Sequence, residues 1–244
     1  LLAGLNACGI DYRADKAARS TTRKPKANRK AEPKAARVDC IAPIPADAIP
    51  FREAAAALQP RGCELKAIYE YRNEAGELMM VAARWDKKNG GSKKVVLPYT
   101  FTEAGWKSAA LPSPRPLYGL DRLAAHADAP ILVVEGEKAA DAAGRIFSNH
   151  VAVTSLGGSG NPHHSDWSPV AGRIVTIWPD ADASGAKYAE AVSRLAHKAG
   201  AASVRVVQIP EAWPESWDLA DLDDPARGPP EPDISLGDLR EMLD

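Results

Sequence analysis

Three acidic residues follow two apolar segments at positions that could bring their carboxylates together. Glu135 comes directly after the apolar run 131–134, and Asp180 and Asp182 follow the apolar run that ends at Trp178. In open α/β sheets the carboxyl ends of parallel strands face the crevice where ligands bind. Carboxylates gathered at short range raise one another's pKa, whereas a divalent hard cation favours their charged forms. The pattern therefore predicts that these three acids hold a divalent cation.

Each of these acids also has a simpler interpretation when it is taken alone. Glu135 stands where the macrodipole of a following helix favours a negative charge. Asp182 is placed to cap the next helix, although neither Pro179 nor Asp180 is needed for a cap. The informative feature is therefore the ordered combination of both segments.

The elements that must position these acids alternate as in a parallel α/β unit, with short apolar strands and amphipathic helices. Helices are expected over about 138–147 and over 184–199, the second with a serine N-cap and with Gly200 at its stop position. Crossover helices between four strands predict one twisted, mainly parallel sheet within 129–224. The expected strands are 131–134, 151–154, 173–178 and 204–209.

A different pattern precedes this unit and predicts a small α+β subdomain at 51–128. Residues 51–58 favour a short helix that ends before Pro60. Two β-rich runs, 65–71 and 78–85, flank a turn and predict a β-hairpin. A third strand is expected to begin near Val95, and basic residues surround the turn before it.

The two ends of the chain have opposite charge, although the net charge is only −1. Residues 1–50 are expected to form a basic, disordered linker, because 15–34 has almost no large apolar side chain to offset ordering entropy. The basic arm is either a nucleic-acid contact or a solvated tail. Residues 225–244 are expected to form an acidic tail with a short helix capped by Ser235.

Composition excludes several classes of protein. Of 244 residues 45% are hydrophobic and 26% charged, and no apolar run approaches the roughly 20 residues of a membrane span. A soluble, cytoplasmic protein is expected. The three cysteines form no CxxC pair, which argues against a disulfide framework and a zinc site. The sequence also lacks the glycine-rich Walker motif that a helicase needs.

The acidic segments resemble the TOPRIM module of bacterial and phage DNA primases. The resemblance rests on Glu-Gly-Glu-Lys at 135–138, Ser-Leu-Gly-Gly-Ser-Gly at 155–160 and Pro-Asp-Ala-Asp-Ala-Ser-Gly at 179–185. It covers roughly 131–224 and implies a Rossmann-like, four-stranded TOPRIM fold. In that family the matching acids are catalytic and bind Mg²⁺, for which Mn²⁺ can substitute. The resemblance implies these roles for Glu135, Asp180 and Asp182.

Two further segments extend the resemblance. Trp-Asp-Leu-Ala-Asp-Leu at 217–222 is similar to the acidic segment that follows the last strand of phage-type primases, which implies that Asp218 joins the metal ligands. The alternative is that Asp218 only opens a short helix and that Asp221 is exposed. Upstream, three segments resemble the small subdomain whose basic residues contact template or nucleotide phosphates: Tyr-Glu-Tyr-Arg-Asn-Glu-Ala-Gly at 69–76, the strand with Lys93 and Lys94, and Pro-Leu-Tyr-Gly-Leu at 116–120. The residues that would bind nucleic acid or nucleotide are Arg84, Lys88, Lys93, Lys94 and Lys138.

Taken as a whole, the resemblance implies a DNA primase of a phage, plasmid or bacterial element. Such an enzyme is a nucleotidyltransferase that makes short RNA primers on single-stranded DNA with Mg²⁺. The implied partners are the template, nucleoside triphosphates and a replicative helicase, with no membrane. Two alternatives stay open: a TOPRIM nuclease that uses the same acids to activate water, and a non-catalytic module that docks DNA or a replication partner.

Overall fold

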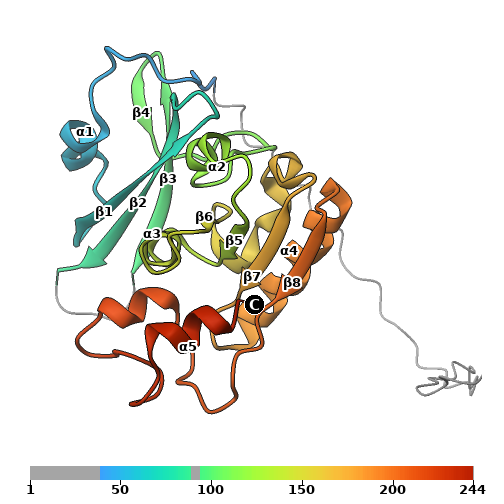
Figure 1. Cartoon of the computed structure of the whole chain (residues 1–244). Coiled ribbons are helices and arrows are strands. Elements are labelled where there is room, and N and C mark those ends of the chain that lie inside the picture. Colours follow the sequence, from blue (N-terminus) through green and yellow to red (C-terminus); the bar gives the residue numbers. More distant parts are fainter. Residues whose placement is uncertain (1–38, 89–93, 244) are drawn as a thin grey trace, which may run out of the picture. The chain divides into compact units, whose positions relative to one another are not determined.

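Two four-stranded sheets, one antiparallel and one parallel, build the part of the chain that the computed structural model describes (Figure 1). This part comprises residues 39–88 and 94–243. Most of the expected linker, with its basic arm, lies outside the described residues, and so does Lys93. Both sheets belong to one compact unit. None of the helices within the described ranges has the length and apolar character to cross a membrane.

The antiparallel sheet has the order β1-β2-β3-β4, and its first two strands form the predicted hairpin. At the hairpin turn the side chain of Asn73 accepts hydrogen bonds from the backbone N–H groups of Ala75 and Glu77. Gly76 adopts a left-handed conformation with φ of 81°, which glycine allows without strain. The strands are β1 (Cys63–Arg72), β2 (Leu78–Lys87), β3 (Val95–Thr102) and β4 (Gly105–Lys107).

Both faces of β2 are covered, because its successive side chains point to opposite sides of the sheet. Val81 packs with Phe51 of helix α1 (Phe51–Leu58), the predicted short helix. Met80 and Ala82 pack on the other face in a cluster that includes residues of the parallel sheet. One face of the antiparallel sheet is thereby directed at the acidic segments.

The chain joins this sheet earlier than the sequence predicts. Ile41 pairs with Phe101, and the N–H of Ile44 donates to the carbonyl oxygen of Leu78 at 2.7 Å. The Ile44 side chain is buried. These isoleucines gain free energy from burial that a Lys- and Ala-rich segment lacks. The predicted linker boundary at residue 50 is therefore too late.

The second sheet has the order β6-β5-β7-β8, and all its strands are parallel. Helix α3 (Glu137–Ile146) connects the first two strands, and helix α4 (Ala183–Ala199) connects the last two. Gly200 ends α4 in a left-handed conformation, as predicted. The strands are β5 (Ile131–Val134), β6 (Val151–Val153), β7 (Ile174–Trp178) and β8 (Ser203–Val206).

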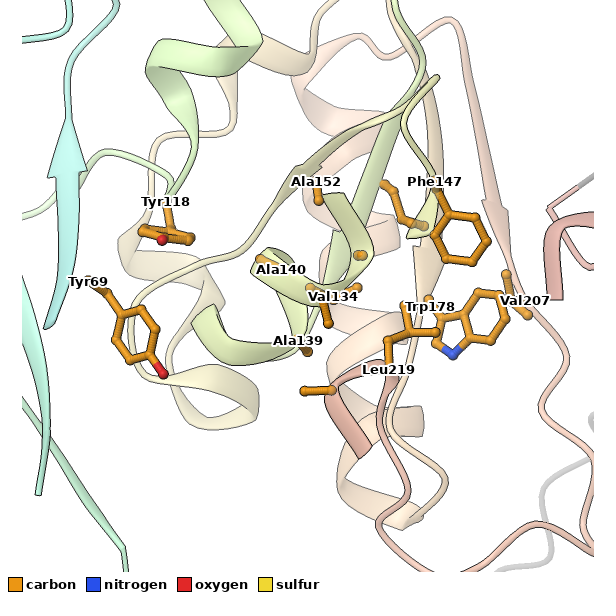
Figure 2. Close-up of a cluster of buried hydrophobic side chains, with 14 of the residues drawn as sticks. Tyr69, Tyr118, Val134, Ala139, Ala140, Phe147, Ala152, Trp178, Val207 and Leu219 are labelled. Carbon is orange, nitrogen blue, oxygen red and sulfur yellow. The ribbon is translucent and has the colours of Figure 1, made fainter. Parts of the chain in front are cut away.

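The two helices cover opposite faces of the parallel sheet, which explains why β5 is apolar throughout. Leu132 and Val134 pack with α3, whereas Ile131 and Val133 pack with α4 and with helix α2 (Leu120–Ala125). Figure 2 shows the α3 side, where Val134, Trp178 and Phe147 form a continuous apolar cluster with Leu219.

The segment after β8 packs into the core and is not a loose tail. Trp213 and Trp217 are buried, with ring centroids 4.9 Å apart, so they anchor this segment to the core. Ser235 caps helix α5 (Leu236–Glu241), and the side chain of Leu239 is buried beside α3.

Four short 3₁₀ helices complete the described part of the chain. They are Gly158–Gly160, Pro162–His164, Ser168–Val170 and Leu219–Asp223.

Candidate active site

The register of β5 and β7 places the two predicted acidic segments at the same edge of the parallel sheet. Val134 pairs with Trp178, so Glu135 lies level with Pro179, and Asp180 follows one residue later. The residues of both strands are buried as far as this edge. A charged side chain within the strands would lose its hydration, whereas one beyond the edge keeps it. The chain therefore turns away at the point where its carboxylates begin.

A cavity of about 460 Å³ opens at this edge and is lined from both sheets. Its acidic side chains come from the loops after β5 and β7, from the first residue of α3 and from the segment after β8. Its basic side chains come from β2, from the residue before β3, from the connector before α2 and from α3. The acidic and basic residues that line it are Glu135, Glu137, Asp180, Asp218, Arg84, Lys94, Arg115 and Lys138.

Glu135 is held by the glycine-rich loop after β6. Its Oε1 atom accepts a hydrogen bond from the backbone N–H of Ser159 at 3.3 Å. Its Oε2 atom is buried and has no hydrogen-bond partner within the described residues. Burial raises the pKa of Glu135, the hydrogen bonds from Ser159 oppose this, and the charges of Asp182 and Asp218 add to it. An acceptor oxygen in this state suits coordination of a cation.

Asp180 has a strongly perturbed carboxyl group. Burial raises its pKa to about 8, with further contributions from the charges of Glu135, Asp218 and Asp182. A nearby divalent cation would reverse this effect, because it stabilises the ionised carboxylate.

Asp182 is engaged as a helix cap. Its Oδ1 accepts from the N–H groups of Ser184 and Gly185, both at 2.8 Å, and Ser216 donates to its Oδ2. Burial opposes ionisation of Asp182, but these hydrogen bonds outweigh it and lower the pKa. Asp182 lines a neighbouring cavity rather than the one that holds Glu135. The predicted serine N-cap of α4 is wrong, because the Asp182 carboxylate reaches two N–H groups at once.

Asp218 lies at the cavity and also caps a short helix. It lines the cavity, and its Oδ1 also accepts from the N–H of Ala220 at 2.6 Å. Asp221 accepts from the N–H of Asp218 at 3.0 Å and completes a capping box. Asp221 is buried and lies 3.1 Å from Arg227, so the alternative with an exposed Asp221 is wrong. Burial and the charge of Asp221 raise the pKa of Asp218.

The acids fit a cation by their chemistry, although their side chains are not gathered around one point. No group of three His, Cys, Asp or Glu side chains in the described ranges is arranged to hold a metal ion. The donors are hard carboxylate oxygens, which Mg²⁺ and Mn²⁺ prefer. The partnerless Oε2 of Glu135 and the raised pKa of Asp180 also fit a cation nearby. Glu135, Asp180 and Asp218 are thus the residues that would hold it.

Three of the predicted basic residues line the same cavity: Arg84, Lys94 and Lys138. The guanidinium of Arg84 is held by Asp86, with Nε 2.9 Å from Oδ1 and Nη2 3.1 Å from Oδ2. Lys94 is exposed directly before β3. Lys88 is exposed at the end of the hairpin and is absent from the cavity lining.

Sequence reasoning missed Arg115, which also lines this cavity. Its Nε donates to the carbonyl oxygen of Leu111 at 2.7 Å, and burial lowers its pKa below the usual value for arginine. The only local signal is its place directly before the Pro-Leu-Tyr-Gly-Leu segment of the connector. Tyr69 and Asn161 line the cavity too, and neither is among the predicted site residues.

Comparison with known proteins finds likeness only at the level of solved structures. No family model matches the chain, and no curated protein matches it. Structures that resemble the chain are catalytic or RNA polymerase domains of primases. A DNA primase domain from Pseudomonas aeruginosa is 17% identical in sequence to this chain, with a TM-score of 0.48. The match covers 76% of this chain and 51% of the Pseudomonas chain.

Two further primase structures are similar. The zinc-binding and RNA polymerase domains of the Aquifex aeolicus primase are 18% identical with a TM-score of 0.48, covering 79% of this chain and 47% of theirs. The RNA polymerase domain of the Mycobacterium tuberculosis primase DnaG is 20% identical, with a TM-score of 0.45. This match covers 80% of this chain and 62% of the Mycobacterium chain. The chain thus spans between 47% and 62% of the length of these three structures.

Proposed function

We propose that this chain is the catalytic core of a DNA primase, which synthesises short RNA primers on single-stranded DNA with Mg²⁺ during replication of a phage, plasmid or bacterial element. The observation that carries the proposal is one cavity in which acids at the edge of a parallel sheet face basic side chains of an antiparallel sheet. The resemblance of the acidic segments to the TOPRIM module supports the same function.

On the acidic side, Glu135, Asp180 and Asp218 would hold Mg²⁺, and Asp182 is the further predicted ligand. Mn²⁺ would serve in its place, because it accepts the same oxygen donors. When bound, the metal neutralises triphosphate charge and lowers the pKa of an attacking 3′-hydroxyl. The buried β5 and β7 strands give these carboxylates a rigid support.

On the basic side, Arg84, Lys94, Arg115 and Lys138 bind phosphates of the nucleotide or the template. The two hydrogen bonds to Asp86 hold the guanidinium of Arg84 in one orientation, so less freedom is lost when a phosphate binds. Phosphate contacts position a substrate without reading its sequence. Lys88, at the end of the hairpin, would contact the template strand outside the cavity, and Lys93 is the further predicted contact with nucleic acid.

The proposed partners follow from this chemistry. Single-stranded DNA supplies the template, and nucleoside triphosphates supply the monomers and the leaving pyrophosphate. A replicative helicase is the proposed protein partner, because a primase needs template that has been unwound.

The test is incubation of the chain with single-stranded DNA, labelled ribonucleotides and Mg²⁺. Labelled oligoribonucleotides support the proposal, and shortened template indicates a nuclease instead. Neither product, with DNA binding retained, indicates a non-catalytic module. Asp180→Asn should abolish synthesis, whereas the control Asp128→Asn, at an exposed aspartate outside the cavity, should leave it unchanged.

A further inference from the structure

Helix α3 carries two carboxylates that are bound by tyrosines from outside the parallel sheet. The hydroxyl of Tyr71, on β1, donates to Oε1 of Glu137 at 2.7 Å. The hydroxyl of Tyr118, in the connector before α2, donates to Oδ1 of Asp141 at 2.8 Å. Glu137 and Asp141 are four residues apart, so they lie on the same face of the helix, one turn from each other. We call these two hydrogen bonds the tyrosine clamp.

The tyrosines support one another by ring packing. The rings of Tyr71 and Tyr118 lie 5.4 Å apart, and the ring of Tyr69 lies 5.9 Å from that of Tyr118. Tyr69 and Tyr71 share a face of β1 because they are two residues apart. Figure 2 shows Tyr69 and Tyr118 beside α3, on the side away from Trp178. This ring packing therefore restricts the orientation of the two tyrosines whose hydroxyl groups donate to α3.

The clamp places a carboxyl group in a buried position, which is unfavourable for stability. Glu137 is only 7% exposed, and burial raises its pKa, with Asp141 adding to this rise through like-charge repulsion. Apolar side chains of similar size at these positions would fill the interface without this desolvation. Hydrogen bonds are directional, whereas apolar contacts are not. The two hydrogen bonds of the clamp therefore fix the rotation of α3 about its axis and its position along that axis.

That setting matters for the cavity because the clamp begins two residues from a predicted metal ligand. Glu137 is the first residue of α3, and Glu135 precedes it with only Gly136 between them. Lys138 is the next residue of the helix. Any rotation of the first turn of α3 therefore moves Glu135 and Lys138 together.

We propose that the tyrosine clamp positions α3, and with it Glu135 and Lys138, relative to the basic side chains on the antiparallel sheet. Tyr71, Tyr118, Glu137 and Asp141 are thus positioning residues that act through Glu135. The effect on catalysis rests on the proposed primase function. The effect on α3 itself does not, so the two can be tested separately.

Hydrogen exchange of the α3 amides, followed by mass spectrometry, tests the structural part. Tyr71→Phe and Tyr118→Phe each remove one hydroxyl and leave the ring. Protection of 137–146 should fall on the order of tenfold in each variant, since a hydrogen bond to a carboxyl group is lost. The matched control is Tyr99→Phe, a buried tyrosine on β3 whose hydroxyl faces the carbonyl of Leu58. Unchanged protection in both test variants would overturn the clamp.

Steady-state primer synthesis tests the catalytic part. Tyr71→Phe should lower kcat on the order of tenfold, because misplacement of a catalytic group acts on the chemical step. The KM for nucleotide should change less than kcat, since only Lys138 of the four proposed phosphate-binding side chains moves with α3, whereas Arg84, Lys94 and Arg115 lie outside this helix. A change in KM alone would contradict the positioning role.

Glu137 offers the decisive substitutions. Glu137→Gln retains an oxygen that accepts from Tyr71 and should keep kcat within about threefold of the wild type, whereas Glu137→Leu should lose as much as Tyr71→Phe. Equal losses in both Glu137 variants would make its charge, and not the hydrogen bond, the important feature and would overturn the proposal. If the wild-type chain makes no primers, the proposed function fails, and the exchange measurement still decides whether the clamp holds α3.

Discussion

The backbone of Gly185, in the first turn of α4, lies directly against the backbone of Asp180. A β-carbon on Gly185 would lie 2.3 Å from the carbonyl oxygen of Asp180 and 2.7 Å from its nitrogen. Real side chains do not tolerate such distances. Only glycine therefore allows the loop after β7 to fold back onto α4, which directs Asp180 to the cavity while Asp182 caps the helix.

Gly185→Ala should displace this loop and move Asp180. We expect primer synthesis to fall on the order of 100-fold, since a shift of about 1 Å in a catalytic group has this effect. The free energy of unfolding should fall by about 1–3 kcal/mol, as for other overpacked sites. Steady-state synthesis and thermal unfolding measure the two effects.

The control for this substitution is Gly144→Ala in α3. Its nearest neighbour is Cβ of Ala152 at 4.0 Å, an ordinary contact. An alanine there should raise stability by about 0.5–1 kcal/mol through its higher helix propensity, with activity unchanged. Wild-type activity in Gly185→Ala would show that the loop after β7 tolerates the displacement.

The elements that position the site were predictable because their signals are local. The apolar run 131–134 between a proline and a glutamate coincides with β5, and the hairpin around Asn73 follows from turn chemistry. The orientation of Asp182 was not predictable. An acidic residue at this position suits a helix cap and a metal ligand equally well. The hydrogen bond from Ser216, 34 positions further along the chain, leaves no local signal in the sequence.

The same reasoning explains what sequence analysis missed. Tyr71 and Glu137 are 66 positions apart, and neither belongs to a pattern that predicts the other. Arg115 reaches the cavity only because the connector runs beside it. Contacts of this kind depend on how two sheets pack, which periodicity along one segment does not encode.

The pKa of Asp180 leads to a prediction on pH. Its value of about 8 in the folded chain compares with about 3.9 for an unfolded aspartate. Between these values the folded protein keeps a proton that the unfolded chain has released, so stability should fall as pH rises from about 4 to about 8. Glu135 acts in the same direction, because its pKa is raised as well.

A cation that binds ionised Asp180 should oppose this loss. The rise in Tm on adding Mg²⁺ should therefore be larger at pH 8 than at pH 6, as measured by thermal unfolding in the presence and absence of the metal. In Asp180→Asn the difference between the two pH values should shrink, since the carboxyl group is gone. An equal rise in Tm at both pH values would contradict this prediction.

Two substitutions of Asp182 separate its role as a helix cap from the role of its negative charge. Asp182→Asn should retain most of the stability, because asparagine caps helices about as well as aspartate. Asp182→Ala should lose about 1 kcal/mol, since the N–H groups of Ser184 and Gly185 lose their acceptor. Urea unfolding measures this difference.

Primer synthesis should fall in both Asp182 variants, because each removes a negative charge near the predicted metal ligands. The Mg²⁺ concentration for half-maximal rate should rise in both. Full activity in Asp182→Asn would leave this residue a helix cap alone, and the metal site would then rest on Glu135, Asp180 and Asp218.

Lys94 and Lys88 should affect different substrates, because only Lys94 lines the cavity. Lys94→Ala should raise the KM for nucleotides roughly tenfold, since a contact with a charged phosphate is worth about 1.5–3 kcal/mol. Lys88→Ala should leave this KM within about twofold and should weaken binding of single-stranded DNA, with the salt dependence of log K reduced by about one unit. Lys107→Ala, at an exposed lysine of β4, is the control for both. If Lys88→Ala raised the nucleotide KM as much as Lys94→Ala, the cavity would not be the nucleotide site.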